Sequence, residues 1–263
     1  MKNFCRHCNS KLEKVVIDLG DQPPSNAYLT CDQLDKNEKK FPLKVYTCTN
    51  CWLMQLPEHA SASELFTSNY AYLSSTSVSW CKHAEDYVKK VVKKLKLGTN
   101  SMVVELASND GYLLQYIKER FIPCVGIEPT SVAAEVARSK GIKTIEKFFG
   151  TSLAEKLISS GGDIPSGADL IIGNNVLAHV PDINDFLKGI FVLLKPQGEA
   201  SLEFPHLLRL LKGKQFDTIY HEHYSYISLT TLVRITEKVG LHIKDVEELK
   251  THGGSLRVWL SKE

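Results

Sequence analysis

Met102-Val-Val-Glu-Leu-Ala-Ser-Asn-Asp-Gly-Tyr-Leu-Leu114 is the stretch of sequence that decides the fold. Its first part, Val103–Leu106, is a short apolar run of the kind that forms a buried strand in a parallel sheet. A turn of small and polar residues follows at Ala107–Gly111, and apolar residues then recur at helical spacing at Tyr112, Leu113, Tyr116 and Ile117. This order predicts the first unit of a nucleotide-binding α/β domain, in which a ligand rests against the backbone of the turn.

Two acidic residues near strand ends favour a nucleoside ligand for this turn. Glu105 lies late in the first strand, and Glu128 ends the next apolar run, Cys124-Val-Gly-Ile-Glu128. An acid at the second position commonly binds ribose hydroxyls. The dinucleotide fingerprint is absent, because Ala107 stands where a first glycine belongs and only Gly111 remains. We therefore predict S-adenosylmethionine, which has no pyrophosphate to bind, rather than NAD. The alternative is a turn that only joins a strand to a helix.

Strand-like and helix-like runs alternate through the rest of the chain, which predicts a doubly wound parallel sheet. Strands are expected at Val103–Leu106, Cys124–Glu128, Ile142–Ile145, Ala168–Gly173, Glu199–Phe204, Leu241–Val246 and Ser255–Leu260. Helices are expected at Trp80–Leu97, Val132–Lys140, Leu153–Ile158, Ile183–Leu194 and Leu229–Val239. Gly98 is interpreted as the end of the first helix, and Lys195–Gly198 as the end of the fourth. Two last strands joined by a turn, one of them antiparallel, best fit the seven-stranded, Rossmann-like sheet of class I methyltransferases.

Length and composition limit the classes of protein to consider. A chain of 263 residues exceeds one average domain. We predict a zinc-binding β-rich domain at 1–60, a linker with an amphipathic helix at 61–98, and a methyltransferase domain at 99–263. A net charge of +2 gives no reason to expect nucleic acid or a membrane surface as a partner. No apolar run is long enough for a membrane span and the N-terminus is not a signal peptide, so a cytoplasmic location is expected.

Two Cys-x-x-Cys pairs in the first 51 residues predict a metal site. Cys5 and Cys8 form one pair, and Cys48 and Cys51 form the other. Each pair can place two thiolates on one metal, and together they complete a tetrahedral zinc site. Because four cysteines leave no open position, the zinc is expected to be structural rather than catalytic. The alternative is a set of unpaired buried cysteines.

A segment rich in tyrosine and histidine, Phe216–Tyr226, is expected at the carboxyl edge of the sheet, where open α/β folds bind ligands. It offers acid and base groups that work near neutral pH, namely Tyr220, Glu222 and His223, and His179 is expected at the same edge. The alternatives are a metal site and a purely structural cluster of tyrosine and histidine side chains. Tyr70 or Tyr72 is expected to reach the reacting centre from a segment that closes over the pocket, unless that segment is only a connector. The histidines without such a setting are expected at the surface or in loops: His59, His83, His206, His242 and His252.

Taken together, these motifs resemble one family over nearly the whole chain: the S-adenosylmethionine-dependent nucleotide-sugar C-methyltransferases. The resemblance is carried by the two cysteine pairs, the turn ELASNDG, and the segments NNVLAHV, YHEHYSY and THGGSLRV. It implies methylation at C-3 of a 4-keto deoxysugar linked to a nucleoside diphosphate. It also implies that the cysteines bind zinc and that the cofactor lies among Glu105, Ala107, Ser108, Asn109, Gly111, Glu128 and Asn174. His223 corresponds to the general base, and Tyr220, Glu222, His179 and one of Tyr70 and Tyr72 border the sugar.

The sequence departs from the family pattern in two ways. Ala107 replaces a glycine that is usual in the turn, and the chain stops at Glu263, where relatives continue into a domain that holds the nucleotide. A separate or missing C-terminal sugar-nucleotide domain is therefore expected. Two other functions stay open: an O- or N-methyltransferase that acts on another small molecule, and a non-catalytic, zinc-tethered scaffold.

Overall fold

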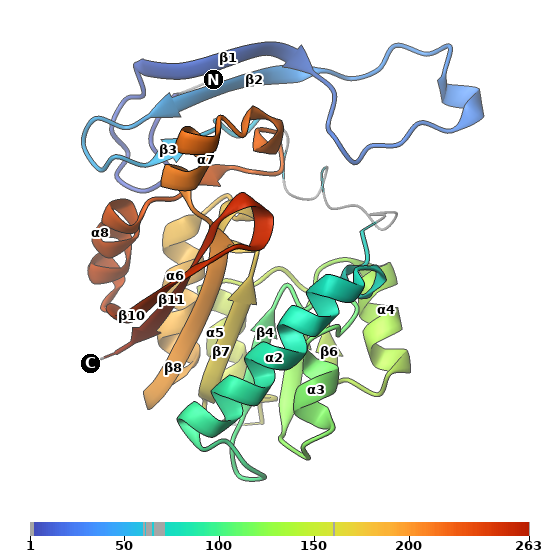
Figure 1. Ribbon diagram of the computed structural model, residues 1–263, viewed down its shortest axis with the longest axis vertical. Coiled ribbons are helices and arrows are strands. Elements are labelled where there is room, and N and C mark those ends of the chain that lie inside the picture. Colours follow the sequence, from blue (N-terminus) through green and yellow to red (C-terminus); the bar gives the residue numbers. More distant parts are fainter. Residues whose placement is uncertain (1–2, 60, 62–64, 66–71, 160, 263) are drawn as a thin grey trace.

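The computed structural model describes residues 3–59, 61, 65, 72–159 and 161–262. Its centre is a seven-stranded sheet of order β10-β11-β8-β7-β4-β5-β6 (Figure 1). In chain order the strands are β4 (Val103–Leu106), β5 (Cys124–Ile127), β6 (Thr144–Ile145), β7 (Ala168–Asn174), β8 (Leu194–Pro205), β10 (His242–Leu249) and β11 (Ser255–Ser261). Strand β11 runs antiparallel to both β8 and β10, and the other neighbouring pairs are parallel. The predicted seven-stranded, doubly wound sheet with one antiparallel strand is confirmed.

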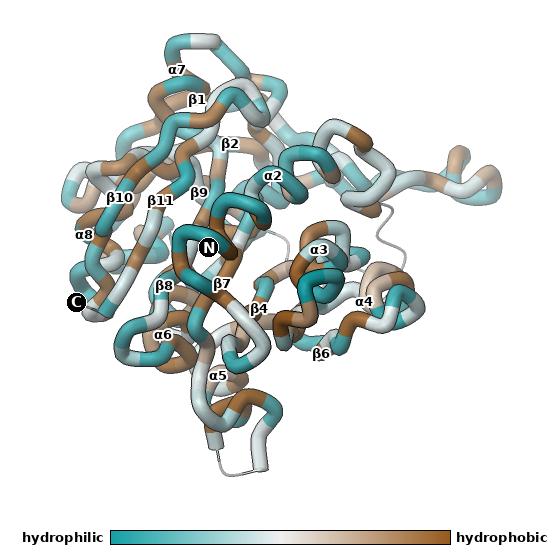
Figure 2. The backbone as a smooth tube through the Cα atoms, turned by 60° about the horizontal axis from the view of Figure 1, so that its bottom comes forward, coloured by the Kyte–Doolittle hydropathy of each residue, from teal (hydrophilic) through white to brown (hydrophobic). Residues whose placement is uncertain are grey.

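Apolar residues on both faces of the central strands explain why helices cover the sheet on two sides. Side chains alternate between the faces of a strand, so Val103 and Val104 enter different cores. One core packs against α2 (Val78–Leu95), α3 (Leu114–Lys118) and α4 (Ser131–Ser139), and the other against α5 (Thr151–Ile158), α6 (Ile183–Leu193) and α8 (Leu229–Val239). In Figure 2, hydrophobic colour marks central strands such as β4, whereas α2 is largely hydrophilic on its outer side. Among the described residues, no helix has the length and apolar character that crossing a bilayer would require.

Two predicted element ends are wrong. Helix α2 ends at Leu95 because Lys96, with φ 51°, adopts the left-handed conformation, so the helix stops before Gly98. Residues Lys195–Gly198 do not form a loop that closes α6. They belong to β8, whose first residue, Leu194, pairs with Ala168 of β7. The register of the two strands shifts between this pair and the next one, Leu170 with Glu199.

A second, four-stranded sheet of order β1-β2-β3-β9 lies over the carboxyl edge of the large one (Figure 1). Its strands are β1 (Lys14–Gln22), β2 (Phe41–Thr47), β3 (Met54–Gln55) and β9 (Ser225–Tyr226). The last strand comes from the tyrosine- and histidine-rich segment and pairs with β3. Helix α7 (Leu207–Gly213), which the sequence analysis missed, packs its Leu207 and Leu210 against this sheet. The small sheet therefore forms a roof, shared between both parts of the chain, over the edge where a ligand is expected.

Candidate active site

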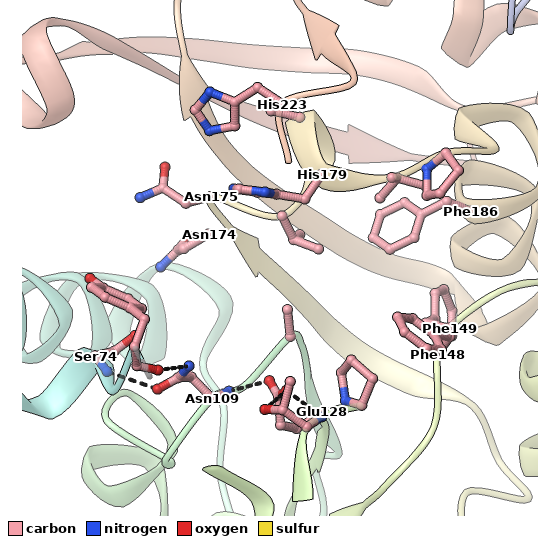
Figure 3. Close-up of a pocket in the computed structure, with 18 of the residues that line it drawn as sticks. Ser74, Asn109, Glu128, Phe148, Phe149, Asn174, Asn175, His179, Phe186 and His223 are labelled. Atoms are coloured by element: carbon pink, nitrogen blue, oxygen red, sulfur yellow. Dashed lines mark hydrogen bonds between the residues drawn. The ribbon is translucent and has the colours of Figure 1, made fainter. Parts of the chain in front are cut away.

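A cavity of about 790 Å³ lies between the carboxyl edge of the large sheet and the roof (Figure 3). The turns after β4, β5 and β7 form its floor, and Ser25 and Asn26 reach it from the roof. Of the predicted site residues, those that line it are Tyr72, Ala107, Asn109, Glu128, Asn174, His179, Tyr220 and His223. Tyr70 lies outside the described residues.

Glu128 anchors the floor of the cavity. One of its carboxylate oxygens accepts a hydrogen bond from the backbone N–H of Asn109 (2.9 Å), and the other accepts from the N–H and the hydroxyl of Thr130 (2.8 and 2.6 Å). Burial raises the pKa of this carboxyl, although the three hydrogen bonds oppose the shift. The acid thus fixes the turn after β4 and still faces the cavity, so the pair of oxygens can also meet hydroxyl groups of a ligand.

Three of the predicted cofactor residues do not line the cavity. Glu105 is buried inside β4, and burial raises the pKa of its carboxyl well above the usual value. Ser108 packs under the turn against Gly126 of β5. Gly111 has φ 75°, and a Cβ there would lie 2.4 Å from Ile142 Cδ1, so the glycine is required by backbone conformation and packing. In this structure these residues shape the turn from beneath.

Asn109 connects the floor to the segment that precedes α2. Its side-chain oxygen accepts from the N–H of Ser74 (2.8 Å), and its amide donates to the carbonyl of Tyr72 (3.1 Å). Tyr72 is about half exposed, at 49%, on the cavity rim. Asn174 ends β7, and the described residues provide no hydrogen-bond partner for its buried Oδ1. An unpartnered acceptor in a cavity wall suits a donor group on a ligand.

An apolar wall that the sequence analysis did not identify completes this half of the cavity. Phe148 and Phe149 follow β6, and Phe149 meets Phe186 edge to face at 5.5 Å between ring centroids. In Figure 3, Phe148 and Phe149 lie to the right of Glu128, and Phe186 lies above them, level with His179. Flat apolar side chains beside a carboxylate that can accept from hydroxyl groups fit the base and ribose of a nucleoside. The sequence signal was weak, since Phe148-Phe149 follows a strand of only two residues.

Ala107 holds a strained backbone conformation at the cavity wall. Its φ of 53° lies in the left-handed region, which costs an L-residue about 1–2 kcal/mol. We expect Ala107→Gly to raise the free energy of unfolding by about 1 kcal/mol, because glycine adopts this conformation without the penalty. Urea unfolding measures the change. Ala133→Gly, within α4, is the control and should lower the free energy by about 1 kcal/mol. A less stable Ala107→Gly variant would contradict the strain.

The imidazole of His223 is held in one tautomer on the opposite side of the cavity. Its Nδ1 lies 2.7 Å from the carbonyl oxygen of Thr218, which can only accept, so Nδ1 carries the hydrogen. The lone pair is therefore on Nε2, which accepts from the hydroxyl of Tyr220 at 2.9 Å. Burial lowers the pKa of His223 to about 4, so the ring is neutral at pH 7. The result is a fixed, unprotonated base that faces the cavity.

His179 and Tyr220 stand beside this base. The rings of His179 and His223 are 4.6 Å apart between centroids, and burial lowers the pKa of His179 well below its usual value. Burial raises the pKa of Tyr220, so its hydroxyl stays protonated and can donate. Glu222 is not at the cavity surface: it accepts from Asn26 Nδ2 at 2.6 Å. His223 is oriented by a backbone carbonyl, and Glu222 instead ties this segment to the roof.

The four cysteines of the predicted metal site form one cluster beside the roof. Cys5 Sγ and Cys51 Sγ are 3.4 Å apart, Cys8 Sγ and Cys48 Sγ are 3.5 Å apart, and all four atoms lie within 4.8 Å of one another. Sulfur atoms on a tetrahedral zinc with bonds of about 2.3 Å would be about 3.8 Å apart. Gln55 Nε2 also donates to Cys5 Sγ at 3.1 Å. The donor set fits zinc, and His7 is engaged elsewhere, with Asn184.

Comparisons with known proteins agree with this architecture. A family described as "Methyltransferase domain" matches residues 80–246, and one described as "Putative zinc binding domain" matches residues 5–66. C-methyltransferase NovU of Streptomyces niveus is 35% identical over 97% of this chain. The chain belongs to the methyltransferase family. It spans 60% of the length of NovU.

Solved structures support the fold of this methyltransferase. The PH0226 protein of Pyrococcus horikoshii superposes with a TM-score of 0.58 at 16% identity, over 73% of this chain and 95% of its own. Magnesium protoporphyrin IX methyltransferase of Synechocystis, solved with bound SAH, gives a TM-score of 0.52 at 15% identity, over 70% and 83% of the two chains. At such identities the likeness establishes the class I methyltransferase fold alone.

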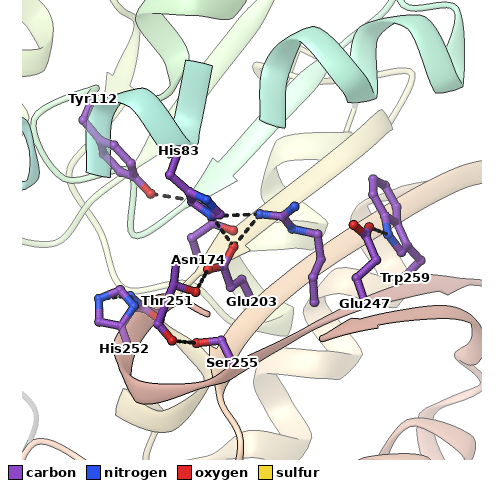
Figure 4. A network of polar contacts seen from close by, with 11 residues as sticks. His83, Tyr112, Asn174, Glu203, Glu247, Thr251, His252, Ser255 and Trp259 are labelled. Carbon is purple, nitrogen blue, oxygen red and sulfur yellow. Dashed lines mark hydrogen bonds and ion pairs between the residues drawn. The ribbon is translucent and has the colours of Figure 1, made fainter. Parts of the chain in front are cut away.

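Two histidines assigned from sequence to the surface or to loops have more specific positions in the methyltransferase. His252 lies in a loop, as expected, but it also lines the cavity. His83 contacts the buried carboxylate of Glu203 (Figure 4). Asn26, Trp80 and Asn175 line the cavity as well, and the sequence analysis assigned none of them to the site. Asn175 and His252 lie in the quoted segments NNVLAHV and THGGSLRV, but these segments indicated no role for either, because each residue reaches the cavity only through the fold.

Proposed function

We propose that this methyltransferase transfers a methyl group from S-adenosylmethionine to C-3 of a nucleotide-linked 4-keto deoxysugar. The observation that carries the proposal is His223, a neutral imidazole with its Nδ1–H fixed by a carbonyl and its Nε2 lone pair at the cavity. Methylation on carbon needs such a base, because a C–H proton must leave. The 35% identity to a protein named C-methyltransferase favours carbon over oxygen or nitrogen as the acceptor atom.

The residues around His223 suit formation of an enolate. The 4-keto group acidifies the neighbouring C-3 hydrogen, which His223 Nε2 would take as a proton while the C–H electron pair moves into a C-3–C-4 double bond. The carbonyl oxygen then becomes negative, and the protonated hydroxyl of Tyr220 can donate to it. Since that hydroxyl bonds Nε2 in the structure, a bound sugar would take over both groups. His179, also neutral, is a second possible donor.

The cofactor half of the cavity fits S-adenosylmethionine. Glu128 would hold the ribose hydroxyls, the wall of phenylalanines the adenine, and the unpartnered Asn174 Oδ1 a donor group such as the ammonium. When bound, the cofactor supplies an electrophilic methyl group for the C-3 carbon. The chain's own contribution is to hold the two reactants in one cavity closed from above by the roof.

The role of Glu128 can be tested by ligand binding. We expect Glu128→Gln to weaken binding of S-adenosylmethionine by about 1–3 kcal/mol, the scale for hydrogen bonds to a charged group. Calorimetry compares S-adenosylhomocysteine with an analogue of it that lacks the ribose hydroxyls. This comparison separates loss of a direct contact between Glu128 and the ribose from a general loosening of the turn after β4. The wild type should prefer the hydroxylated ligand, and the variant should not. Glu135→Gln, on the exposed side of α4, is the matched control. If Glu128→Gln still prefers the ligand with ribose hydroxyls, another residue binds the ribose.

Isotope exchange tests the proposed function as a whole. The substrate is a thymidine-diphosphate-linked 4-keto deoxysugar with deuterium at C-3, incubated with the protein and S-adenosylmethionine. Transfer to carbon should release the deuterium and place the methyl group on C-3, which mass spectrometry and NMR detect. Methylation with full retention of deuterium would instead show transfer to oxygen or nitrogen. No methylation of this substrate by the wild type would contradict the proposal.

A further inference from the structure

The turn between β10 and β11 places a strained histidine in the cavity wall. His252 lies within the turn Thr251–Gly253 with φ 50° and ψ 43°, and it lines the cavity. This left-handed conformation costs a non-glycine residue about 1–2 kcal/mol. Strain of this kind persists where the surrounding structure enforces it, and it is concentrated at functional sites. His252 has no part in the mechanism proposed above, so its conformation needs another explanation.

The surroundings of His252 hold the turn rigidly. Thr251 Oγ1 donates to Glu203 Oε1 at 2.7 Å, and the fully buried Glu203 is held in turn by His83, at 2.9 Å, and by Arg257 (Figure 4). Burial alone would raise the pKa of Glu203, but the His83 hydrogen bond and the Arg257 charge bring it below its usual value. A buried carboxylate, rather than solvent, therefore fixes one end of the turn.

The other end of the turn is equally fixed. Gln215 Nε2 donates to the carbonyl of Gly253 at 2.9 Å. Gly253 has φ 74°, and a Cβ there would lie 2.5 Å from the same Gln215 nitrogen. The backbone N–H of His206 donates to the carbonyl of Gly254 at 3.0 Å. With both ends anchored, the backbone of the turn is held in one conformation, and His252 lies at the cavity wall.

A second strained residue meets His252 from a different strand. Asn175, directly after β7, has φ 53°, and its Nδ2 lies 3.0 Å from His252 Nε2. Its backbone N–H donates to the carbonyl of Glu203 at 2.7 Å, so both residues depend on the same part of β8. The edge of Trp80 meets the imidazole at 4.8 Å between ring centroids and limits its movement. Among the described residues, no group donates to the buried Asn175 Oδ1.

From this geometry we infer that Asn175 and His252 form a recognition site for a hydroxyl group of the acceptor. The inference rests on the proposed function. Asn175 Oδ1 is an acceptor that awaits a donor, and an imidazole supplies a donor or an acceptor beside it, which matches a hydroxyl that both donates and accepts. Burial lowers the pKa of His252, so the imidazole is neutral at pH 7. A neutral imidazole favours a neutral ligand group, such as a hydroxyl of a sugar ring, over an anion.

Sheet order separates this site from the ribose-binding position proposed for Glu128. Glu128 follows β5, whereas Asn175 follows β7 and His252 follows β10, on the other side of β4. His252 also lies near His223, since a positive charge on the His252 ring would lower the pKa of His223. A group bound by Asn175 and His252 therefore belongs to the molecule that His223 deprotonates.

His252→Gly is the decisive variant, because glycine keeps the backbone conformation and removes only the ring. We expect unchanged affinity for S-adenosylmethionine and a KM for the acceptor about 3–10-fold higher, the worth of one hydrogen bond, with little change in kcat. Two thymidine-diphosphate-linked 4-keto sugars that differ by one ring hydroxyl are the probes. The wild type should prefer the hydroxylated sugar, and both His252→Gly and Asn175→Ala should reduce that preference.

Lys96→Gly is the matched control. Lys96 has φ 51° at the exposed end of α2, so the change relieves similar backbone strain far from the cavity and should leave KM unchanged. An unchanged acceptor KM in His252→Gly, or a loss that falls on the cofactor, would overturn the inference. So would a His252 ring resonance that stays fixed when either sugar is added to the wild type, whatever its activity. Failure of the wild type to methylate either sugar would instead count against the proposed function.

Discussion

Replacing His223 by asparagine is expected to lower turnover by about 10²–10⁴-fold, the usual worth of a general base. The amide can still donate to the Thr218 carbonyl, but it has no basic nitrogen to take a proton. Affinity for S-adenosylmethionine should be unchanged, because Glu128 and the turn after β4 lie on the other side of the cavity (Figure 3). Exchange of the C-3 proton, followed by NMR with S-adenosylhomocysteine present, should fall in parallel with turnover. A fall in turnover without a fall in exchange would mean that His223 serves a different step.

His221→Asn is the matched control for this variant. His221 is also a buried imidazole, two residues away, but its Nε2 donates to the Phe41 carbonyl at 3.1 Å and it does not line the cavity. Its replacement should leave proton exchange at C-3 close to normal. His179→Asn should give a smaller loss than His223→Asn if His179 only stabilises the enolate. Near-normal exchange in His223→Asn would assign the base to another residue, with Tyr220 the next candidate.

The pH profile gives a second measure of the same base. Burial lowers the folded-state pKa of His223 to about 4, so most of the base is unprotonated at neutral pH. The acid limb of kcat/KM, which reports the free enzyme, should therefore fall only as pH drops toward that value and not near 6.5. An acid limb near 6.5 that disappears in His223→Asn would show that the base is more exposed in solution than its position here implies.

The parts of the fold that local sequence pattern determines were predicted closely. Strand β4 and helix α8 have the bounds expected from the sequence, since a continuous apolar run and a helical repeat specify them without help from neighbours. The doubly wound, mainly parallel character of the sheet followed from the alternation of strands and helices, whereas the strand order came from the structure. The cysteine pairs were found because the spacing of metal ligands is itself a local signal.

The parts that depend on contacts distant in sequence were not predicted. Strand β9 has two residues and exists only because β3 pairs with it. Helix α7 has only seven residues, of which Leu207 and Leu210 face the roof while Leu208 and Leu211 are exposed. Asn175 lies in the segment NNVLAHV and His252 in THGGSLRV, but neither segment indicated a contact between them, because that contact depends on backbone conformations of residues 77 positions apart in sequence. Sequence also left open whether Glu222 orients the His223 ring or binds a hydroxyl group of the sugar, because hydrogen-bond partners in an irregular segment depend on the fold.

The zinc cluster is bound to the walls of the cavity through one arginine, which makes the effect of metal removal predictable. Arg6 stands between the ligands Cys5 and Cys8, and its guanidinium donates to the carbonyls of Pro181 and Leu56 at 2.5 Å each. The same group lies 5.1 Å from the centre of the Tyr224 ring. Burial lowers the pKa of Arg6 to about 10, so the group remains charged at neutral pH. Pro181 follows the His179 turn, and Tyr224 follows His223.

We expect removal of the zinc to abolish methyl transfer and to leave cofactor binding largely intact. Structural zinc contributes about 10–16 kcal/mol of apparent folding free energy in zinc-finger peptides, so its loss should unfold the backbone around the four cysteines. Without it, Arg6 would lose its position, and the two segments that carry His179 and His223 would lose a shared anchor. The floor around Glu128 is built by β4 and β5 and does not depend on the cluster. Affinity for S-adenosylhomocysteine is therefore the internal reference.

Cys48→Ser and dialysis against a chelator should give the same result, measured by metal analysis, turnover and hydrogen exchange. Amides of β3 and β9 should lose protection together, because these strands pair with each other, whereas amides of β4 should keep theirs. Cys31→Ser is the control, since Cys31 is exposed and outside the cluster. Arg6→Gln tests the contact between the metal site and the cavity wall without removing the zinc. The variant should retain zinc yet lose part of the activity, because the shorter amide cannot reach the carbonyls of both Pro181 and Leu56. A zinc-free protein with normal turnover would show that the cluster does not hold the segments of His179 and His223 in place. Absence of zinc from freshly purified protein would contradict the metal site itself.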